Sequence, residues 1–293
     1  MKLGWIGTGV MGRWMAEHLL KAGNKLHVNN IPKERTDVLV QQGAVFSSVP
    51  EMARSCDVVF TMVGFPQELE ALYFGKEGLF ANMRPGSLLV DHTTSSPSLA
   101  VRISEEAAKK SLTAIDAPVS GGDEGARLGK LAIMCGGDKA GFERAKPLME
   151  KYGANVRLMG KAGVGQHTKL TNQIVLTGNL VGMVEGFLYA HKAGLDLHQM
   201  VELVATGAAG SNYFKAIAPK IMKNDYSPGF YVQHLVKDLG LALDECKRMG
   251  IILPGLSLAN QFYLSMMAHG EEKLGCHALI KVLERLNNTK FNP

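Results

Sequence analysis

Residues 2–12 read KLGWIGTGVMG, and this stretch decides the fold of the first half of the chain. A short apolar run leads into Gly7-Thr8-Gly9-Val10-Met11-Gly12, which matches G-x-G-x-x-G, and helical periodicity follows over residues 10–22. In this setting the first glycine permits a tight turn, the second lets the backbone approach a pyrophosphate, and the third lets the helix pack on the strand. The N–H groups at the helix start favour phosphate. The stretch therefore predicts a dinucleotide-binding βαβ unit.

The rest of the chain falls into two parts of different character. Up to residue 160, strand-like runs alternate with helical segments, which predicts right-handed crossovers and a mainly parallel sheet. The predicted strands are 2–7, 25–30, 44–48, 57–63, 87–92, 112–119, 131–137 and 155–160, and the helices between them include 10–22, 33–42, 97–110 and 139–152.

From Gly165 onward only helical periodicity is found. The predicted helices are 165–193, 197–206, 212–224, 231–249, 256–270 and 276–288. The first is unusually apolar around its circumference, which predicts a buried central helix. We therefore expect an α/β protein with an N-terminal Rossmann-type doubly wound sheet domain over residues 1–162, followed by an all-α C-terminal domain over residues 163–293.

Composition restricts the possible partners. The 32 basic and 27 acidic side chains give a net charge of +5, and no block of Lys and Arg indicates nucleic acid, so a small anionic substrate or cofactor is favoured. No uninterrupted apolar stretch reaches the roughly 18 residues of a membrane helix, so no membrane partner is expected. The opening apolar run is broken by glycines and lacks a cleavage site for secretion.

Four well-separated cysteines predict a reduced, cytoplasmic protein. Neither they nor the nine histidines form a metal-ligand pattern.

The residues after the second predicted strand bear on the choice between NAD and NADP. NAD-binding proteins commonly end this strand in Asp or Glu, which bonds the ribose hydroxyls, whereas this chain has Asn30. Asn30 can hydrogen-bond either cofactor, and no arginine comes directly after it. Lys33 and Arg35 nearby add positive charge. The sequence favours NADP and leaves NAD open.

Two further stretches carry polar groups suited to chemistry. Residues 116–122, DAPVSGG, come after a strand, and their small residues expose N–H groups and one hydroxyl that suit a bound carboxylate. Residues 163–173, GVGQHTKLTNQ, place Lys169 and Asn172 on one face at the start of the apolar helix. A lysine beside a buried segment tends to lose its proton or find a partner. These residues predict either half of an active site or an ordinary helix entrance.

Five motifs occur in a fixed order, and together they resemble the β-hydroxyacid dehydrogenase family over the whole chain. They are the glycine motif, DHTTSSP (91–97), DAPVSGG (116–122), GVGQHTK (163–169) extended by Asn172, and VKDLGLAL (236–243). The resemblance implies an NAD(P)-dependent oxidoreductase without a metal, which transfers a hydride between nicotinamide and a small carboxylate-bearing hydroxy acid or semialdehyde.

The resemblance also implies a role for each matching residue. Lys169 is expected to be the proton donor and acceptor, and Asn172 to orient the substrate or the amine. Lys237 would close over the cofactor, held by Asp238. The residues expected to bind the substrate carboxylate are Ser120, Gly121 and Gly122. Those expected to contact the cofactor are Gly7, Thr8, Gly9, Val10, Met11, Gly12, Asn30, Met62, Val63, Thr94 and Lys237, with Thr94 at the junction of nicotinamide and substrate. Core packing explains Met62 and Val63 almost equally well.

Several points stay open at this stage. Thr93 stands where the family usually has serine, and Asn30-Ile31 departs from its usual pair. His167 lies two residues from Lys169 and is expected to point away from it, and Gly165 is expected to leave space beside the lysine. An imine reductase and a non-catalytic dinucleotide-binding module are the alternatives, although relatives of both kinds usually lack the lysine. The apolar central helix predicts a homodimer or homotetramer, and Tyr213 or Phe230 is a candidate for shaping the substrate pocket.

Overall fold

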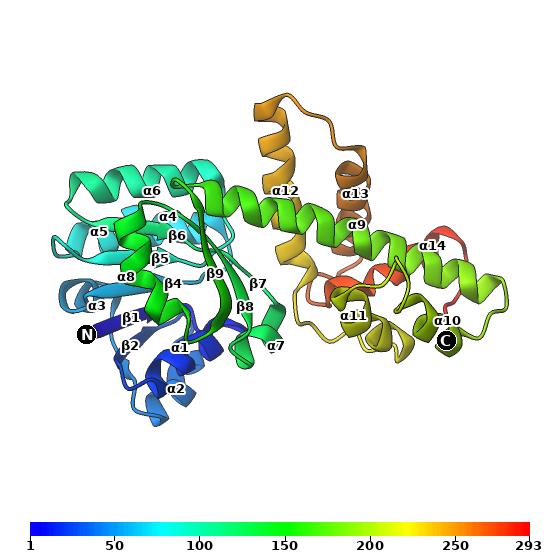
Figure 1. Ribbon diagram of the computed structural model, residues 1–293, viewed down its shortest axis with the longest axis horizontal. Helices are drawn as coiled ribbons and strands as arrows, with labels where there is room; N and C mark the ends of the chain where they lie inside the picture. Colours follow the sequence, from blue (N-terminus) through cyan, green and yellow to red (C-terminus); the bar gives the residue numbers. More distant parts are fainter. The chain divides into compact units, whose positions relative to one another are not determined.

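The computed structural model describes residues 1–293, and these residues form two compact units, Met1–Lys169 and Leu170–Pro293. The first is a sheet covered by helices and the second is helical (Figure 1), which confirms the predicted fold class. The division falls inside helix α9 (Val164–Lys192), a little after the boundary at residue 162 that the sequence predicts, because the first turns of α9 hydrogen-bond to the sheet unit.

The first unit contains a nine-stranded sheet in the order β3-β2-β1-β4-β5-β6-β8-β7, with β9 paired to β8. The strands are β1 Lys2–Ile6, β2 Lys25–Asn29, β3 Val45–Phe46, β4 Val58–Thr61, β5 Leu88–Asp91, β6 Thr113–Asp116, β7 Val119–Ser120, β8 Leu131–Gly136 and β9 Gly153–Gly160. All pairs from β3 to β6 are parallel, whereas β8 runs antiparallel to β6 and β7. The predicted strand 112–119 is divided into β6 and β7, since Pro118 cannot donate a hydrogen bond to a sheet.

The carboxyl ends of the five central parallel strands are in register. Ile6 pairs with Asn29 and with Thr61, Thr61 pairs with Asp91, and Asp91 pairs with Asp116. The strand order turns between β1 and β4, and in doubly wound sheets ligands bind outside the carboxyl ends of the strands at such a point. A ligand site is therefore expected among the loops that leave this edge.

Helices cover both faces of this sheet. Buried side chains of α1 (Gly12–Lys21), α2 (Asp37–Gln41), α7 (Gly122–Arg127) and α8 (Lys139–Met149) belong to the core on one face, and those of α3 (Val49–Ser55), α4 (Pro66–Phe74), α5 (Leu79–Asn82) and α6 (Pro97–Lys109) to the core on the other. A 3-10 turn, η1 (Lys33–Thr36), precedes α2. The sequence did not predict α3, α4, α5 or α7, although Pro66 at the first position of α4 is a common start signal.

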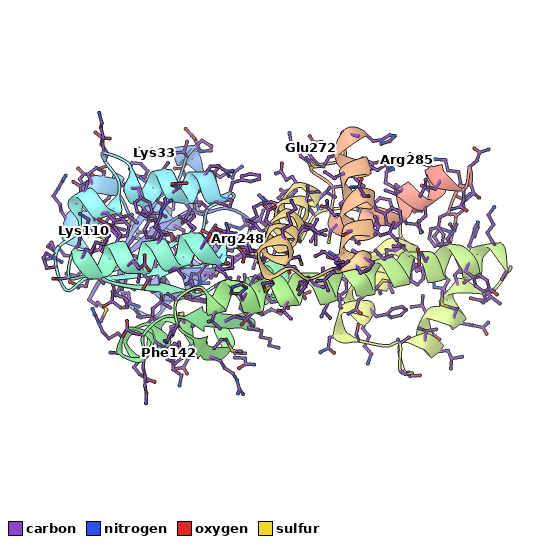
Figure 2. All side chains as sticks on the ribbon, turned by 90° about the horizontal axis from the view of Figure 1, so that it is seen from above. Lys33, Lys110, Phe142, Arg248, Glu272 and Arg285 are labelled. Carbon is purple, nitrogen blue, oxygen red and sulfur yellow. The ribbon has the colours of Figure 1, made fainter.

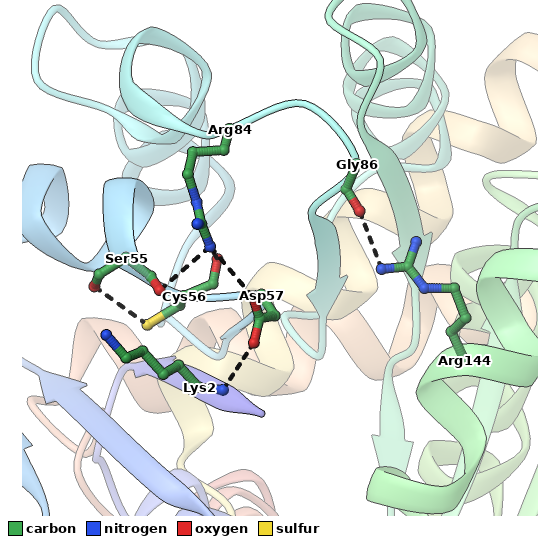
Figure 3. A network of polar contacts seen from close by, with 7 residues as sticks. All are labelled: Lys2, Ser55, Cys56, Asp57, Arg84, Gly86 and Arg144. Atoms are coloured by element: carbon green, nitrogen blue, oxygen red, sulfur yellow. Dashed lines mark hydrogen bonds and ion pairs between the residues drawn. The ribbon is translucent and has the colours of Figure 1, made fainter.

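The amino edge of the sheet is held by polar contacts of its own (Figure 3). The Arg84 guanidinium donates to the Ser55 and Cys56 carbonyls and to Asp57, and the backbone N–H of Lys2 donates to the other Asp57 oxygen. Arg84 thereby ties the end of α3 to the start of β4. These charged groups have structural partners and lie at the opposite edge from the loops at the carboxyl ends of the strands.

In the second unit the remaining part of α9 packs with shorter helices. These are α10 (Leu197–Val204), α11 (Asn212–Met222), α12 (Val232–Met249), α13 (Pro254–Ala268), the 3-10 turn η2 (Cys276–Leu279) and α14 (Ile280–Leu286). Leu180, Val184 and Phe187 of α9 are buried in its core. By length and composition alone α9 would be able to cross a membrane, a property that it shares with long core helices.

The expectation of a buried central helix is correct for only one side of α9. Val175 is 59% exposed and Tyr189 is 76% exposed, and they lie on a face that also carries Gly178, Gly182 and Gly186. Glycines and a few hydrophobic residues make this face look apolar in the sequence, although it also carries the exposed Asn179 and Glu185. This face is left uncovered in a single chain.

A buried histidine lies in the core of the sheet unit. The His92 ring stacks near Trp5 and Phe60, at centroid distances of 5.7 and 5.9 Å. Its Nδ1 lies 2.6 Å from the Ala117 carbonyl oxygen, so Nδ1 donates, and its Nε2 accepts from the Tyr152 hydroxyl at 2.8 Å. Burial lowers the pKa of His92 to about 4. The ring is therefore a neutral part of the core.

This arrangement predicts a specific dependence of stability on pH. The pKa of His92 rises from about 4 to its ordinary value of 6.5 on unfolding, so the unfolded chain binds the extra proton between these values. The contribution of His92 is complete above pH 6.5 and is lost as the pH falls toward 4. The free energy of unfolding is measured by urea titration for wild type and for His92→Gln. The value for wild type minus the value for the variant should decrease by about 1 kcal/mol for each unit by which the pH is lowered in this window. A difference that does not change with pH would contradict the assignment.

Candidate active site

The glycine motif joins the end of β1 to α1, and its three glycines differ in what surrounds them. A Cβ on Gly7, whose φ is +100°, would lie 2.0 Å from the Met62 carbonyl oxygen, and one on Gly12 would lie 2.0 Å from the Gly7 carbonyl oxygen. A Cβ on Gly9 would meet no protein atom within 4 Å. Protein packing thus explains Gly7 and Gly12, whereas the open space at Gly9 suits the close approach of a ligand to the backbone.

The start of α1 is suited to an anion. No side chain caps it, and its first turn holds no acidic residue. Val10 is partly exposed, and its neighbour Met11 is half-buried. The N–H groups and the positive end of the helix dipole therefore remain available for phosphate.

Asn30 has a structural partner that the sequence did not reveal. Its Oδ1 accepts from the Thr8 N–H at 2.9 Å and its Nδ2 donates to the Pro32 carbonyl oxygen at 2.9 Å. Thr8 in turn donates from its hydroxyl to the Arg35 carbonyl oxygen. Asn30 thus ties the glycine motif to the loop after β2. The Lys33 ammonium, at the surface of this unit (Figure 2), lies 4.6 Å from the centroid of the Phe46 ring.

Hydrogen bonds fix the loops after β4 and β5 to each other. The Val63 N–H donates to the Thr93 hydroxyl at 3.1 Å, and Asp91 accepts from the Thr93 N–H and from the Thr61 hydroxyl. Burial raises the pKa of the Asp91 carboxyl to about 7, against the effect of these hydrogen bonds. Met62 and Val63 are half-buried and pack against the two cores. Core packing therefore explains both residues, and their contact with a cofactor stays a prediction. Thr94, half-buried, comes next in the same loop.

The carboxylate of Asp116, at the end of β6, receives the start of α9. Its Oδ1 accepts from the Gly163 N–H at 2.8 Å and its Oδ2 from the Gln166 N–H at 2.9 Å. Burial raises the pKa of Asp116, and these backbone hydrogen bonds oppose that rise. The side chain thus acts as a cap for α9 from a distant part of the sequence, which satisfies N–H groups that have no partner within the helix.

The expected reason for Gly165 is wrong. A Cβ there would lie 2.4 Å from the Met134 carbonyl oxygen and 2.6 Å from the Asp116 Oδ2. The missing side chain therefore lets α9 approach β8 and β6, and it does not leave room for a ligand.

Lys169 belongs to a buried polar stripe on an otherwise apolar helix. Four side chains on one face of α9 are 7% exposed or less, namely Gln166, Lys169, Gln173 and Thr177. A buried polar group is costly unless it is hydrogen-bonded, so such a stripe on an apolar helix indicates specific polar contacts. His167, in contrast, is exposed, which agrees with the expectation that it points away from Lys169.

Residues 120–122 leave the sheet at the start of α7. Ser120 of β7 pairs with Ala132 of β8, and Gly121 and Gly122 come next with φ values of +135° and +65°. Positive φ favours glycine at both positions. The backbone there turns sharply from β7 into α7, and all three residues keep some exposure.

In the second unit, Asn172 and Lys237 are joined through two other side chains. The Asn172 amide donates to the Gln173 Oε1 at 2.9 Å, and the Gln173 Nε2 donates to the Asp238 Oδ2 at 2.6 Å. Asp238 is 1% exposed and forms an ion pair with the Lys237 ammonium at 3.2 Å. The predicted contact of Asp238 with Lys237 is present, and Gln173 was not anticipated. Tyr213 and Phe230 both pack against the core of this unit.

The sequence alone did not predict the contacts of Gln166 and Gln173 or the capping role of Asp116. A usable signal was present for the two glutamines, because polar residues at one-turn spacing from Lys169 on an apolar helix are unusual. The residues at the carboxyl edge fit a dinucleotide, which requires an open glycine beside an uncapped helix start. No group of three His, Cys, Asp or Glu side chains is gathered as metal ligands.

Two family models cover most of the chain. One, described as the NAD binding domain of 6-phosphogluconate dehydrogenase, matches residues 2–160. The other, described as the NAD-binding domain of NADP-dependent 3-hydroxyisobutyrate dehydrogenase, matches residues 163–283.

Relatives of known sequence and structure match over nearly the full length. A probable mitochondrial 3-hydroxyisobutyrate dehydrogenase-like protein of Arabidopsis thaliana is 50% identical, over 98% of this chain and 86% of its own length. The 2-hydroxy-3-oxopropionate reductase of Escherichia coli is 36% identical over 99% and 100% of the two chains. The crystal structure of 3-hydroxyisobutyrate dehydrogenase from Salmonella typhimurium has a TM-score of 0.88 at 29% identity, over 96% and 99% of the chains.

The surroundings of Gly9 and Gly12 predict different consequences for the same substitution. Gly9→Ala should keep the melting temperature and weaken binding of the dinucleotide about tenfold or more, because the added methyl group enters only the ligand space. Gly12→Ala should cost about 1–3 kcal/mol of stability, since the methyl group meets the Gly7 carbonyl oxygen. Thermal melting and fluorescence titration with NADPH measure both. Equal effects of the two substitutions on melting would contradict this distinction.

Proposed function

Since this chain belongs to the β-hydroxyacid dehydrogenase family and is an NAD(P)-dependent oxidoreductase, we propose that Lys169 is its proton donor and acceptor and that a small carboxylate-bearing hydroxy acid or semialdehyde is its substrate. The observation that supports this most directly is a lysine buried to 7% exposure on a helix whose start is hydrogen-bonded to the Thr93–Ser95 loop. Burying a lysine is costly, and an ordinary helix entrance would not need one.

The bound nicotinamide would supply or accept the hydride. The chain's own part is to stabilise the charge that develops on the substrate oxygen. The Lys169 ammonium would donate a hydrogen bond to that oxygen and transfer its proton from Nζ as the carbonyl is reduced, and the neutral amine would take the proton back in the oxidative direction. Thr94 would lie beside the reacting carbon, and Asn172 would orient the substrate or the amine.

The substrate carboxylate would be held by residues 120–122. The Ser120 hydroxyl and the backbone N–H groups of Gly121 and Gly122 are donors at a turn with positive φ, a geometry that concentrates N–H groups toward an anion. Substrates without a carboxylate would lose these contacts. The Arabidopsis and Escherichia coli relatives are named for a small hydroxy acid and for an oxo acid, which supports this proposal.

We infer a preference for NADP over NAD. Asn30 stands where a carboxylate would repel the 2′-phosphate of NADP, and its amide carries no charge. The basic side chains of Lys33 and Arg35 follow in the next few residues. The description of a matching family model names an NADP-dependent 3-hydroxyisobutyrate dehydrogenase, which supports the same preference. For the remaining cofactor contacts, we propose Gly7 to Gly12, Met62, Val63 and Thr94 in the sheet unit and Lys237 in the helical unit.

Activity measurements test the role of Lys169. With NADPH or NADH and a panel of small semialdehydes, wild type should turn over at least one substrate and should favour NADPH. Lys169→Ala should lower kcat by about 10²-fold or more, the scale of general acid–base catalysis, and should keep cofactor affinity. Lys192→Ala, an exposed lysine in the last turn of the same helix, is the matched control and should be unaffected. Cofactor binding without turnover of any substrate by wild type would favour a non-catalytic binding module.

We also propose that the protein functions in the cytoplasm, where its four free cysteines stay reduced.

We further propose that the chain forms a homodimer or homotetramer through the exposed face of α9. Gly178, Gly182 and Gly186 recur at one-turn spacing, and a Cβ on each would meet nothing within 4 Å. Each glycine in an exposed helix interior costs about 1 kcal/mol relative to alanine. Close approach of a second backbone would offset this cost.

A bulky charged side chain on this face should separate the subunits. Gly182→Arg should elute as a monomer by size-exclusion chromatography with light scattering at micromolar concentration, whereas wild type and Gly255→Arg should remain oligomeric. Gly255 is an exposed glycine of α13 with open space around it, so it controls for the added charge. Monomeric wild type would exclude the proposed association.

A further inference from the structure

The side chain of Gln166 is fully buried, and both ends of its amide are hydrogen-bonded. The Nε2 donates to the Thr93 carbonyl oxygen at 2.7 Å, and the Oε1 accepts from the Ser95 N–H at 3.0 Å. The backbone N–H of the same residue donates to Asp116 at 2.9 Å. One residue therefore connects the start of α9, the loop after β5 and the end of β6.

These contacts restrict how α9 can move against the loop. Gln166 forms hydrogen bonds with the backbone of the residues on both sides of Thr94. Thr94 is therefore held between two fixed neighbours. Lys169 lies one turn further along α9, on the same face as Gln166. The distance between the lysine and the Thr94 loop thus depends on the Gln166 amide.

We propose that Gln166 is a positioning residue for the reaction, which fixes the Lys169 ammonium against the Thr94 loop and thereby sets the rate of proton transfer. The proposal rests on the proposed function of Lys169. Both hydrogen bonds of the Gln166 amide are to backbone groups of the loop, so its effect acts through the placement of the lysine. Misplacement of a catalytic group by about 1 Å costs about 10²-fold in rate.

A purely structural amide would have a different signature. It would contribute to stability through two buried hydrogen bonds, and its loss would lower the melting temperature without a specific change in turnover. An informative substitution therefore alters the hydrogen bonds reversibly in one folded protein. Gln166→Glu does this, because a carboxylic acid donates and accepts as the amide does, whereas a carboxylate only accepts.

The pH profile of Gln166→Glu is the test. Burial raises the pKa of an introduced carboxyl, so protonation falls within reach of an activity assay. At low pH the neutral acid donates to the Thr93 carbonyl oxygen and accepts from the Ser95 N–H. At high pH the carboxylate faces the Thr93 carbonyl oxygen without a proton. The ratio of kcat in Gln166→Glu to kcat in wild type should fall by about tenfold or more from pH 6 to pH 9, with the KM for NADPH nearly unchanged.

Two further variants complete the experiment. Gln166→Met, of similar size and without an amide, should show a kcat about 10- to 100-fold lower at every pH, while it still binds NADPH. Gln41→Glu places the same new charge at an exposed position of α2 and should behave as wild type at all pH values. A kcat ratio for Gln166→Glu that does not change with pH, or a Gln166→Met enzyme with wild-type kcat, would overturn the proposal.

Failure of this proposal is distinguishable from failure of the proposed function. If wild type turns over a semialdehyde and Lys169→Ala does not, the role of the lysine stands whatever the Gln166 variants show. If Gln166→Met is too unstable to assay, the pH profile of Gln166→Glu, measured together with its melting temperature at each pH, decides alone. A loss of kcat that merely parallels loss of folded protein would assign Gln166 to stability.

Discussion

The hydrogen bonds between the Asp116 carboxylate and the first N–H groups of α9 are the contact on which the rest of the site depends. They join the end of a central strand to the start of the long helix. Burying a carboxylate costs free energy, and so does burying the N–H groups at a helix start without partners. The hydrogen bonds between the two offset both costs. Glycine at positions 136 and 165 makes this possible, since a Cβ at either would lie within 2.6 Å of an Asp116 oxygen. The joint is thus steric as well as electrostatic.

This joint places Gln166 and Lys169 of α9 at the edge of the sheet from which the loops proposed to bind the cofactor emerge. The parallel strands end in register, so the loops after β1, β4, β5 and β6 leave the sheet at the same edge. Asp91 and Asp116, at paired positions on β5 and β6, each hold a neighbouring segment by its backbone N–H groups. The rigid scaffold ends in two carboxylates whose partners are the loop and the helix that carry Thr94 and Lys169.

Local patterns in the sequence predicted most of the strands and helices, and much less of the contacts between distant segments. The glycine motif, Lys169 and the Lys237–Asp238 pair are local patterns, so their helices and loops were predictable. The partners of Gln166 lie far away in the sequence, and helical periodicity does not say which side chains meet across such distances. Gly165 was misinterpreted for the same reason, because its neighbours come from β6 and β8. The exposed face of α9 was missed since glycine is counted neither as polar nor as charged.

A crystal structure with NADP+ and a small carboxylate-bearing hydroxy acid bound tests the central claim most directly. The account predicts that the Lys169 Nζ lies about 3 Å from the substrate hydroxyl oxygen, within hydrogen-bond reach, while the Gln166 amide keeps its bonds to Thr93 and Ser95. A complex in which that nitrogen points into bulk water, with another side chain at the reacting oxygen, would contradict it.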